Sequence, residues 1–220
     1  AIELEQGRKV RRKEKDELKE QVMLEMLPQA FSRNRRCFAY LAPQDGVLVV
    51  DAGSAKQAED LASTLRKSLG SLPVRPPAVE QSPAFTLTGW LNESIDHPAN
   101  ITLGSECELK DPSEDGGVVR CKGLDLKADE IRNHLEAGMQ VTKLALTWDD
   151  NVSFVLDEEL GIRRLKFGET LQEQLDDVDV DDALAKFDAA FTIMTLELSR
   201  LIPGLLEALG GEDRSAIVEE

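Results

Sequence analysis

Apolar and polar positions alternate over several short stretches of the chain, which is typical of half-buried β-strands. The clearest alternation covers residues 140–148. Short polar turns, such as Pro43-Gln44-Asp45-Gly46, join neighbouring stretches and predict antiparallel hairpins and a meander. The expected strands are residues 37–42, 47–51, 85–88, 101–109, 118–122, 140–148, 152–156 and 162–167.

Helical patterns alternate with these strands. Residues 54–69 read as a helix in which Ser54 is the N-cap and Gln57 completes a capping box. Further helices are expected over residues 128–137 and, as a long element, over residues 181–209. Together with a helix near the start of the chain, the pattern predicts an α+β fold with antiparallel sheets and long helices at both ends.

The order of elements predicts four segments in the 220 residues. The boundary after residue 71 is placed where Leu72 to Pro83 carries four of the nine prolines. The segments are residues 1–71 with the basic helix, hairpin and capped helix, residues 72–116 with a proline-rich linker and short strands, residues 117–209 with a strand, a helix, a meander and the long helix, and residues 210–220 as a flexible acidic tail.

Charge changes the interpretation of the first helix. The chain carries a net charge of −16, yet Gly7 to Arg36 holds ten cations and five anions. A segregated basic segment on an acidic protein indicates a polyanion site, because the local field and not the net charge steers a ligand. The cations are Arg8, Lys9, Arg11, Arg12, Lys13, Lys15, Lys19, Arg33, Arg35 and Arg36.

Helical spacing gathers part of this charge on one face, where Arg8, Arg11, Arg12, Lys15 and Lys19 lie together. The same face turns apolar after Lys19, so we expect the second half of the helix to be buried and Pro28 to end it. The alternative is a solvated helix with ordinary ion pairs four residues apart, Arg12–Asp16 and Lys13–Glu17.

Signals for catalysis are missing from the sequence. There is no phosphate-binding GxxxxGK[ST], no GxGxxG and no GxSxG. The aspartates at 176, 177, 179, 181 and 182 lack the glycine and distal glutamate of a calcium loop, and we interpret them as helix-capping residues rather than a metal site. We therefore expect no enzymatic activity, no cofactor and no metal.

Features that would direct the chain to a membrane or out of the cell are also missing. It has no run of about 18 apolar residues and no leader pattern at its start. Cys37, Cys107 and Cys121 are odd in number and lack a CxxC motif, which fits reduced thiols. These observations predict a cytoplasmic protein.

Several blocks, in order along the chain, resemble one bacterial family. They are Met26-Leu27-Pro28-Gln29-Ala30-Phe31-Ser32-Arg33, Leu65-Arg66-Lys67-Ser68-Leu69-Gly70-Ser71-Leu72-Pro73, Glu114-Asp115-Gly116-Gly117-Val118-Val119-Arg120, Val141-Thr142-Lys143-Leu144-Ala145-Leu146 and Arg164-Leu165-Lys166-Phe167. Over Arg8 to Gly211 the chain resembles the recombination-associated protein RdgC family.

The resemblance implies a homodimer that closes into a ring around double-stranded DNA, does not read the DNA sequence, and is associated with the nucleoid and with restraint of RecA-driven strand exchange. Arg8 matches a family position linked to DNA contact, and Lys122 falls near another basic position of the inner ring. Gln29 stands where some members carry Arg. The expected DNA-binding residues are therefore the ten cations of Gly7 to Arg36 together with Gln29 and Lys122.

Phe31 matches a family position linked to contact between the two subunits. The alternative is that its ring folds back onto Met26 and Leu27 as a local plug. For the whole chain, the alternative function is that of a protein–protein regulator that binds a partner through its acidic surface. Salt-dependent binding to duplex DNA separates these two functions.

Overall fold

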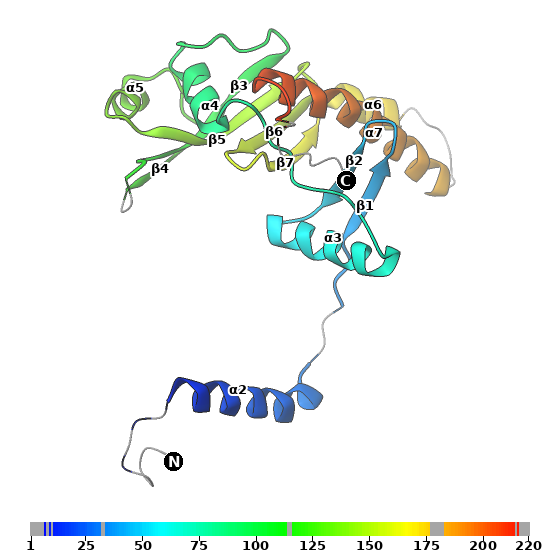
Figure 1. The fold of residues 1–220 in the computed structure, drawn as a ribbon. Helices are drawn as coiled ribbons and strands as arrows, with labels where there is room; N and C mark the ends of the chain where they lie inside the picture. The colour runs from blue at the N-terminus through cyan, green and yellow to red at the C-terminus, as the bar shows by residue number, and fades with distance from the viewer. Residues whose placement is uncertain are drawn as a thin grey trace. The chain divides into compact units, whose positions relative to one another are not determined.

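The structure, a computed structural model, describes residues 7, 9, 11–31, 34–113, 116–176, 183–213 and 215, and among these it leaves the side chains of residues 174–176 undescribed. The chain divides into two compact units, Ala1–Tyr40 with Val49–Leu61, and Leu41–Leu48 with Ala62–Glu220. Figure 1 shows the elements of each. The division into four segments expected from the sequence stays a prediction.

A five-stranded antiparallel sheet forms the centre of the second unit, with strand order β4-β3-β5-β6-β7. Its strands are β3 (Ile101–Lys110), β4 (Val118–Lys122), β5 (Gln140–Trp148), β6 (Val152–Asp157) and β7 (Ile162–Phe167). The antiparallel α+β architecture, the hairpins and the meander are as predicted, and β4, β5 and β7 have the predicted bounds.

One face of this sheet carries the core. Alternate residues of the strands point to this face and are buried, among them Leu109, Leu144, Leu146, Val152 and Leu156. Helices α4 (Pro83–Leu91), α5 (Asp129–Glu136), α6 (Glu169–Asp176) and α7 (Ala183–Ala208) belong to the same unit. The core face is therefore the one that the helices cover, and the opposite face carries charged residues together with Ala145 and Val155.

Helix α4 replaces a strand that the alternation of Phe85-Thr86-Leu87-Thr88 predicts, so that prediction is wrong. Pro83 lies in the first turn of the helix, where its fixed φ favours helical geometry. Leu87 and Trp90 are almost fully buried. The Thr88 hydroxyl donates a hydrogen bond to the Ala84 carbonyl at 2.6 Å, and its oxygen accepts one from the Val141 backbone N–H at 2.9 Å. A short apolar run fits either a strand or a buried helix, and packing on β5 here favours the helix.

Helix α7 is buried only in its second half. Leu198, Leu201 and Leu205 are in the core, whereas Leu184 and Phe187 are exposed. Among the described residues, α7 is the helix long and apolar enough by composition to cross a membrane. Because its second half belongs to the core of the sheet unit, we interpret it as a core helix.

The remaining elements are α2 (Arg12–Met26), the one-turn helix η1 (Leu27–Gln29), the hairpin β1 (Phe38–Ala42) and β2 (Val47–Asp51), and α3 (Ala55–Leu69). Ser54 caps α3 as predicted, since the Gln57 backbone N–H donates to Ser54 Oγ at 3.3 Å. The second half of the predicted capping box differs, because the Gln57 side chain accepts from the Gly53 backbone N–H at 3.2 Å. Gly70 ends α3 with a φ of +82°, a conformation that glycine adopts without strain.

Candidate polyanion-binding surfaces

Helix α2 carries its cations at the end where they are least favourable for the helix. Arg11 is the N-cap, and Arg12, Lys13 and Lys15 follow directly. The partial positive charge of a helix N-terminus repels cations and attracts anions. In the first turn only Glu14 offsets the repulsion, and its carboxylate accepts a hydrogen bond from the Arg11 backbone N–H at 2.9 Å. Cations placed here weaken the helix but add to its attraction for an external anion.

The ion pairs of the solvated-helix alternative, Arg12–Asp16 and Lys13–Glu17, do not form. Within the part of the chain that the structure describes, Arg12, Lys13, Lys15 and Lys19 make no ion pair. Their side chains lie in solvent and are free to meet a ligand. Lys9, Arg11, Gln29, Arg35 and Arg36 are exposed too, whereas Arg8 and Arg33 lie outside the described residues.

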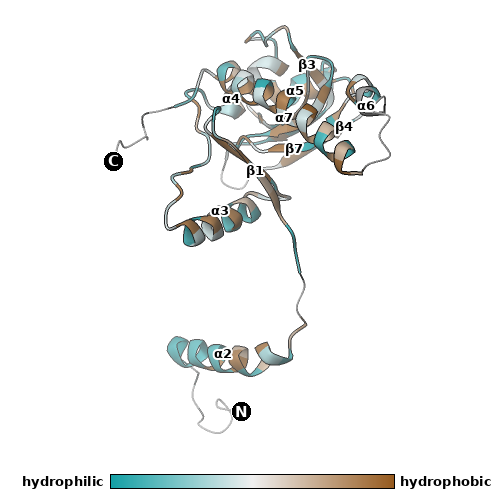
Figure 2. Ribbon diagram, turned by 90° about the vertical axis from the view of Figure 1, so that its right-hand side faces the viewer, coloured by the Kyte–Doolittle hydropathy of each residue, from teal (hydrophilic) through white to brown (hydrophobic). Residues whose placement is uncertain are grey.

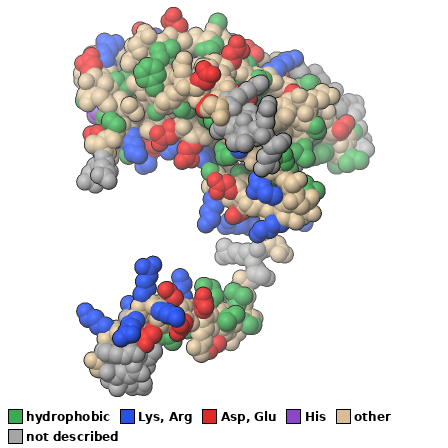
Figure 3. Space-filling model, viewed as in Figure 1, with side chains coloured by type: hydrophobic (Ala, Val, Ile, Leu, Met, Phe, Trp, Pro, Cys, Tyr) green, Lys and Arg blue, Asp and Glu red, His purple; other side chains and the backbone are tan. Residues whose placement is uncertain are grey.

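The apolar half of α2 is exposed, so the prediction that it is buried is wrong for the described chain. Val22, Met23 and Met26 are 47%, 52% and 64% exposed. Figure 2 shows this end of the helix in brown, and Figure 3 shows Lys and Arg on the first half of α2 and hydrophobic side chains on the second. Sequence periodicity shows which face of a helix is apolar, but not whether another element of the same unit covers it.

Phe31 is 102% exposed, as much as in an extended peptide. The alternative in which its ring packs on Met26 and Leu27 is therefore not what the structure shows, and both of these residues are themselves 64% exposed. An aromatic ring left fully in water beside other exposed apolar side chains is typical of a surface that a partner covers.

A second group of cations lies on the face of the sheet opposite the core, which we call the open face. On β3, Glu106 and Glu108 alternate with the buried Cys107 and Leu109 and so point to this face. Cations outnumber carboxylates here. The charged residues of the open face are Glu106, Glu108 and Lys110 on β3, Arg120 and Lys122 on β4, Lys143 on β5, Asp157 on β6, and Arg163, Arg164 and Lys166 on β7.

A β-bulge in β7 increases this charge. The pairing of β6 with β7 shifts between Ser153 and Val155, and Arg164 has a φ of +53°. The extra residue lets Arg163, Arg164 and Lys166 all reach the open face, where strict alternation would divide them between both faces. The bulge thus adds an arginine to the polar surface instead of placing it in the core.

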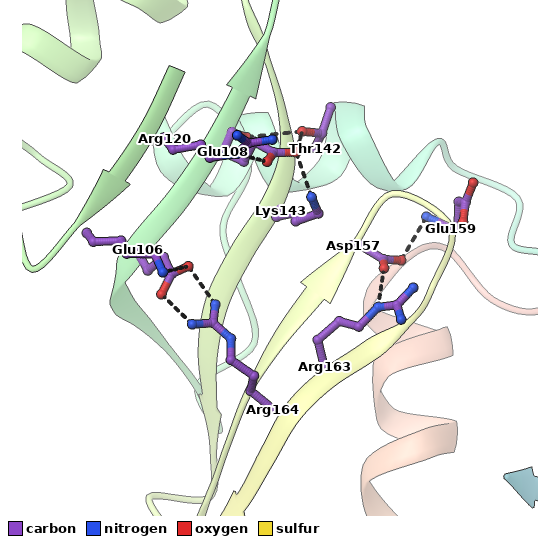
Figure 4. A network of polar contacts seen from close by, with 10 residues as sticks. Glu106, Glu108, Arg120, Thr142, Lys143, Asp157, Glu159, Arg163 and Arg164 are labelled. Atoms are coloured by element: carbon purple, nitrogen blue, oxygen red, sulfur yellow. Dashed lines mark hydrogen bonds and ion pairs between the residues drawn. The ribbon is translucent and has the colours of Figure 1, made fainter. Parts of the chain in front are cut away.

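Ion pairs link the open face across the strands (Figure 4). The Glu108 carboxylate accepts hydrogen bonds from Arg120 Nε at 2.7 Å and Lys143 Nζ at 2.8 Å. The Glu106 carboxylate accepts two from the Arg164 guanidinium, at 2.9 and 2.5 Å, and pairs with Lys122 Nζ at 3.7 Å. Each of these carboxylates is therefore shared by two cations, and each trio keeps a net positive charge.

The same contacts hold both carboxylates in the charged form. Burial alone would raise the pKa of Glu108, but hydrogen bonds from Lys143, Arg120 and Thr142 outweigh burial and lower the pKa to about 2. The Arg164 hydrogen bonds lower the pKa of Glu106, and the same pair raises the pKa of Arg164. Both carboxylates are thus ionised at neutral pH.

Asp157 lies at the end of the open face and has a structural role. Its side chain is 7% exposed and accepts hydrogen bonds from the backbone N–H of Gly161 at 2.7 Å and from Arg163 Nε at 2.8 Å. These bonds fix the turn between β6 and β7. Arg163 is consequently the least accessible cation of the ion-paired group, at 32% exposed.

Of the described residues expected from the sequence, only Lys122 lies on the open face, whereas Lys9, Arg11, Arg12, Lys13, Lys15, Lys19 and Gln29 are on α2 and η1 or next to them, and Arg35 and Arg36 precede β1. Sequence reasoning missed Arg120, Lys143, Arg164 and Lys166. Alternation in β4 and β5 could have placed Arg120 and Lys143 on one face with Lys122, because strand side chains alternate. No comparable signal existed for Arg164, since a bulge sets its direction.

The cysteines and the acidic groups suggest no site on these surfaces. Cys107 and Cys121 are direct partners across β3 and β4 and are both buried. Burial, together with the neighbouring Cys121, raises the pKa of Cys107 to about 12, so this thiol stays protonated and packs as a small apolar group. Among the described residues, no group of three or more His, Cys, Asp or Glu could hold a metal ion. Asp177, Asp179, Asp181 and Asp182 lie outside these residues.

An α+β chain of net charge −16 that keeps cations together on one helix and on one sheet face has the features of a polyanion-binding protein. The sequence model of a family described as "Putative exonuclease, RdgC" matches residues 1–212. The chain belongs to the RdgC family.

Relatives named "Recombination-associated protein RdgC" are similar over nearly the whole chain. The protein of Aeromonas hydrophila is 53% identical over 215 residues, which are 98% of this chain and 71% of the relative. Those of Psychromonas ingrahamii and Pseudomonas aeruginosa are 50% identical over 212 residues, 96% of this chain and 70% or 69% of the relatives. The two names differ on enzymatic activity, so the absence of such activity stays a prediction.

Proposed function

We propose that this protein binds double-stranded DNA without reading its sequence, encircles the duplex as a ring-shaped homodimer, and restrains RecA-dependent recombination at the nucleoid in the cytoplasm. The observation that carries the proposal is the set of unpaired cations on α2 of a strongly acidic chain. Duplex DNA fits such a surface because its phosphates supply most of the affinity in non-specific binding. The names of the relatives supply the link to recombination.

The proposed interface has two parts, each on its own unit. Helix α2 contributes Lys9, Arg11, Arg12, Lys13, Lys15 and Lys19, and the sheet contributes Lys122 and the other cations of the open face. We include Arg8, Gln29, Arg33, Arg35 and Arg36 in the interface as expected from the sequence. In a homodimer every one of these residues occurs twice, so two copies double the charge presented to DNA.

Exposed apolar side chains support the proposed homodimer. Met26, Leu27 and Phe31 are together in sequence and lie mostly in water. A second copy of the same surface would cover them by a symmetric contact, since a two-fold interface brings the same patch of both subunits together. The alternative function, in which a protein partner binds the acidic surface, does not need the unpaired cations of α2.

A charge-reversal experiment on α2 tests the proposal. The double variant Arg12→Glu with Lys19→Glu should weaken binding to duplex DNA and reduce the salt dependence of binding. For the protein itself, the logarithm of the affinity should fall with the logarithm of salt concentration by about 0.9 per neutralised phosphate. Because the double variant removes two cations from each subunit, and so four from the dimer, this slope should lose roughly three to four units. Fluorescence anisotropy with unrelated duplexes at several salt concentrations measures both quantities.

The matched control is Lys56→Glu with Lys67→Glu on α3, which changes the net charge by the same amount at exposed helical positions. The control should keep most of the affinity. Equal losses in both double variants would mean that only net charge matters and would remove α2 from the interface. A preference of roughly a thousandfold for one duplex sequence would overturn non-specific binding.

A further inference from the structure

Glu106 and Glu108 occupy an unusual place for acidic residues on a face rich in cations. Their side chains are only 25% and 14% exposed, whereas those of Arg120, Lys122 and Arg164 are 70%, 68% and 51% exposed. The carboxylates are thus close to the sheet, and the cationic groups extend further into solvent. Figure 4 shows both acids with their partners from neighbouring and more distant strands.

The cations donate to Glu106 and Glu108 the kind of hydrogen bonds that a phosphate accepts. Arg164 uses both terminal nitrogens on Glu106, in the two-pronged geometry with which arginine binds carboxylate or phosphate. Lys143 Nζ and Arg120 Nε are directed to Glu108. The two carboxylates therefore stand in the positions of phosphate oxygens.

We infer that Glu106 and Glu108 are internal competitors of the DNA phosphates on the open face, so that a duplex binds there by exchanging with carboxylates. This inference rests on the proposed function. It goes beyond that function because it assigns acidic residues the role of limiting affinity. Held on the same strand scaffold, the carboxylates compete at a high effective concentration.

Under this inference, α2 and the open face differ in how strongly their cations bind DNA phosphates. The described cations of α2 are unpaired and gain a full interaction with each phosphate. The cations bound to Glu106 and Glu108 gain only the difference between phosphate and carboxylate, which keeps the sheet's hold on DNA weak. Within the part of the chain that the structure describes, Lys110 and Lys166 make no ion pair and so remain available on the same face.

The test is Glu106→Gln, which keeps the size of the side chain and releases Arg164 and Lys122. Affinity for a duplex of random sequence should rise about three- to tenfold at low salt, since exposed ion pairs are each worth up to roughly 1 kcal/mol. The salt slope should steepen by about two to four units, because the cations released in the two subunits of the dimer can neutralise further phosphates.

Glu93→Gln is the matched control. Glu93 also pairs with a lysine, Lys127, and its substitution changes net charge equally, but it follows α4 in the helical layer. Arg164→Gln completes a double-mutant cycle. Arg164→Gln alone should weaken binding, because it removes an open-face cation and leaves Glu106 paired with Lys122 only, among the described residues. In the Glu106→Gln background it should remove most of the gain.

The outcomes separate the inference from the proposed function. Equal effects of Glu106→Gln and Glu93→Gln, with α2-dependent duplex binding intact, would overturn the inference alone. Weaker binding by Glu106→Gln would also overturn it, because Glu106 would then position Arg164 instead of competing with DNA. Failure of the unmodified protein to bind duplex DNA at low salt would overturn the proposed function itself.

Discussion

The ion pairs of Glu108 make the stability of the sheet depend on pH. Its carboxylate is 14% exposed and holds Arg120 and Lys143, which come from the two strands on either side of β3. Hydrogen bonds that favour the charged form stabilise the folded state only while the carboxylate stays ionised. Stability gained in this way depends on pH by linkage.

We predict that acid removes this stabilisation between about pH 4.5, the ordinary glutamate pKa, and its folded value of about 2. A lowered carboxyl pKa adds stability above the unfolded pKa and loses it as pH falls through the folded one. Glu108→Gln should thus be less stable than the natural protein by roughly 2 kcal/mol at pH 7, with the gap closing towards pH 2. Urea unfolding at a series of pH values measures the gap, and parallel curves for the two proteins would contradict the prediction.

The sequence predicts some helices and strands but not others. The strands β4, β5 and β7 and the hairpin follow from alternation and turn residues, because half-buried strands must show period two. Helix α4 does not follow, since its short apolar run fits a strand or a buried helix equally well and only packing on β5 decides. The charge of α2 is readable in the sequence, whereas the open face depends on strand order and on the bulge at Arg164.

The contact between α7 and β5 gives a prediction at the scale of elements. A Cβ atom on Gly204 would lie 2.1 Å from Cη2 of the Trp148 ring, which is 5% exposed. Gly204→Ala should therefore destabilise the sheet unit by about 1–3 kcal/mol through overpacking. In an exposed helix a Gly→Ala change increases the free energy of unfolding by about 1 kcal/mol. The sign of the change therefore shows whether Gly204 is tightly packed against Trp148.

Thermal unfolding followed by tryptophan fluorescence detects the effect of Gly204→Ala and any shift of the Trp148 environment. Glu207→Ala, at an exposed position of the same helix, is the control and should change stability by less than about 0.5 kcal/mol. A Gly204→Ala protein as stable as the natural one would mean that α7 can move away from β5 at little cost.

At the scale of the whole molecule, net charge and local charge oppose each other. A chain of −16 repels DNA at long range, so the proposed DNA binding must rely on the short-range fields of α2 and the open face. Salt screens both the repulsion and the attraction. Once cations contact phosphates, added salt mainly weakens binding, because it reduces the free energy gained when counterions leave the DNA. The proposed dimer would help because it doubles the cations that one duplex meets, and we expect its formation to depend on apolar contacts that salt does not screen.

Phe31 tests whether such a dimer forms through the surface beside α2. Because its ring is 102% exposed, Phe31→Ala should leave the melting temperature of the subunit unchanged. If the ring anchors the contact between copies, its loss should cost about 2 kcal/mol and weaken dimerisation roughly thirtyfold. DNA affinity should then fall as well, even if Phe31 touches no phosphate. Sedimentation velocity at several concentrations reports the dimer, with Phe85→Ala, 61% exposed on α4, as the matched aromatic control. An unchanged dimer in Phe31→Ala would exclude this surface as the subunit contact.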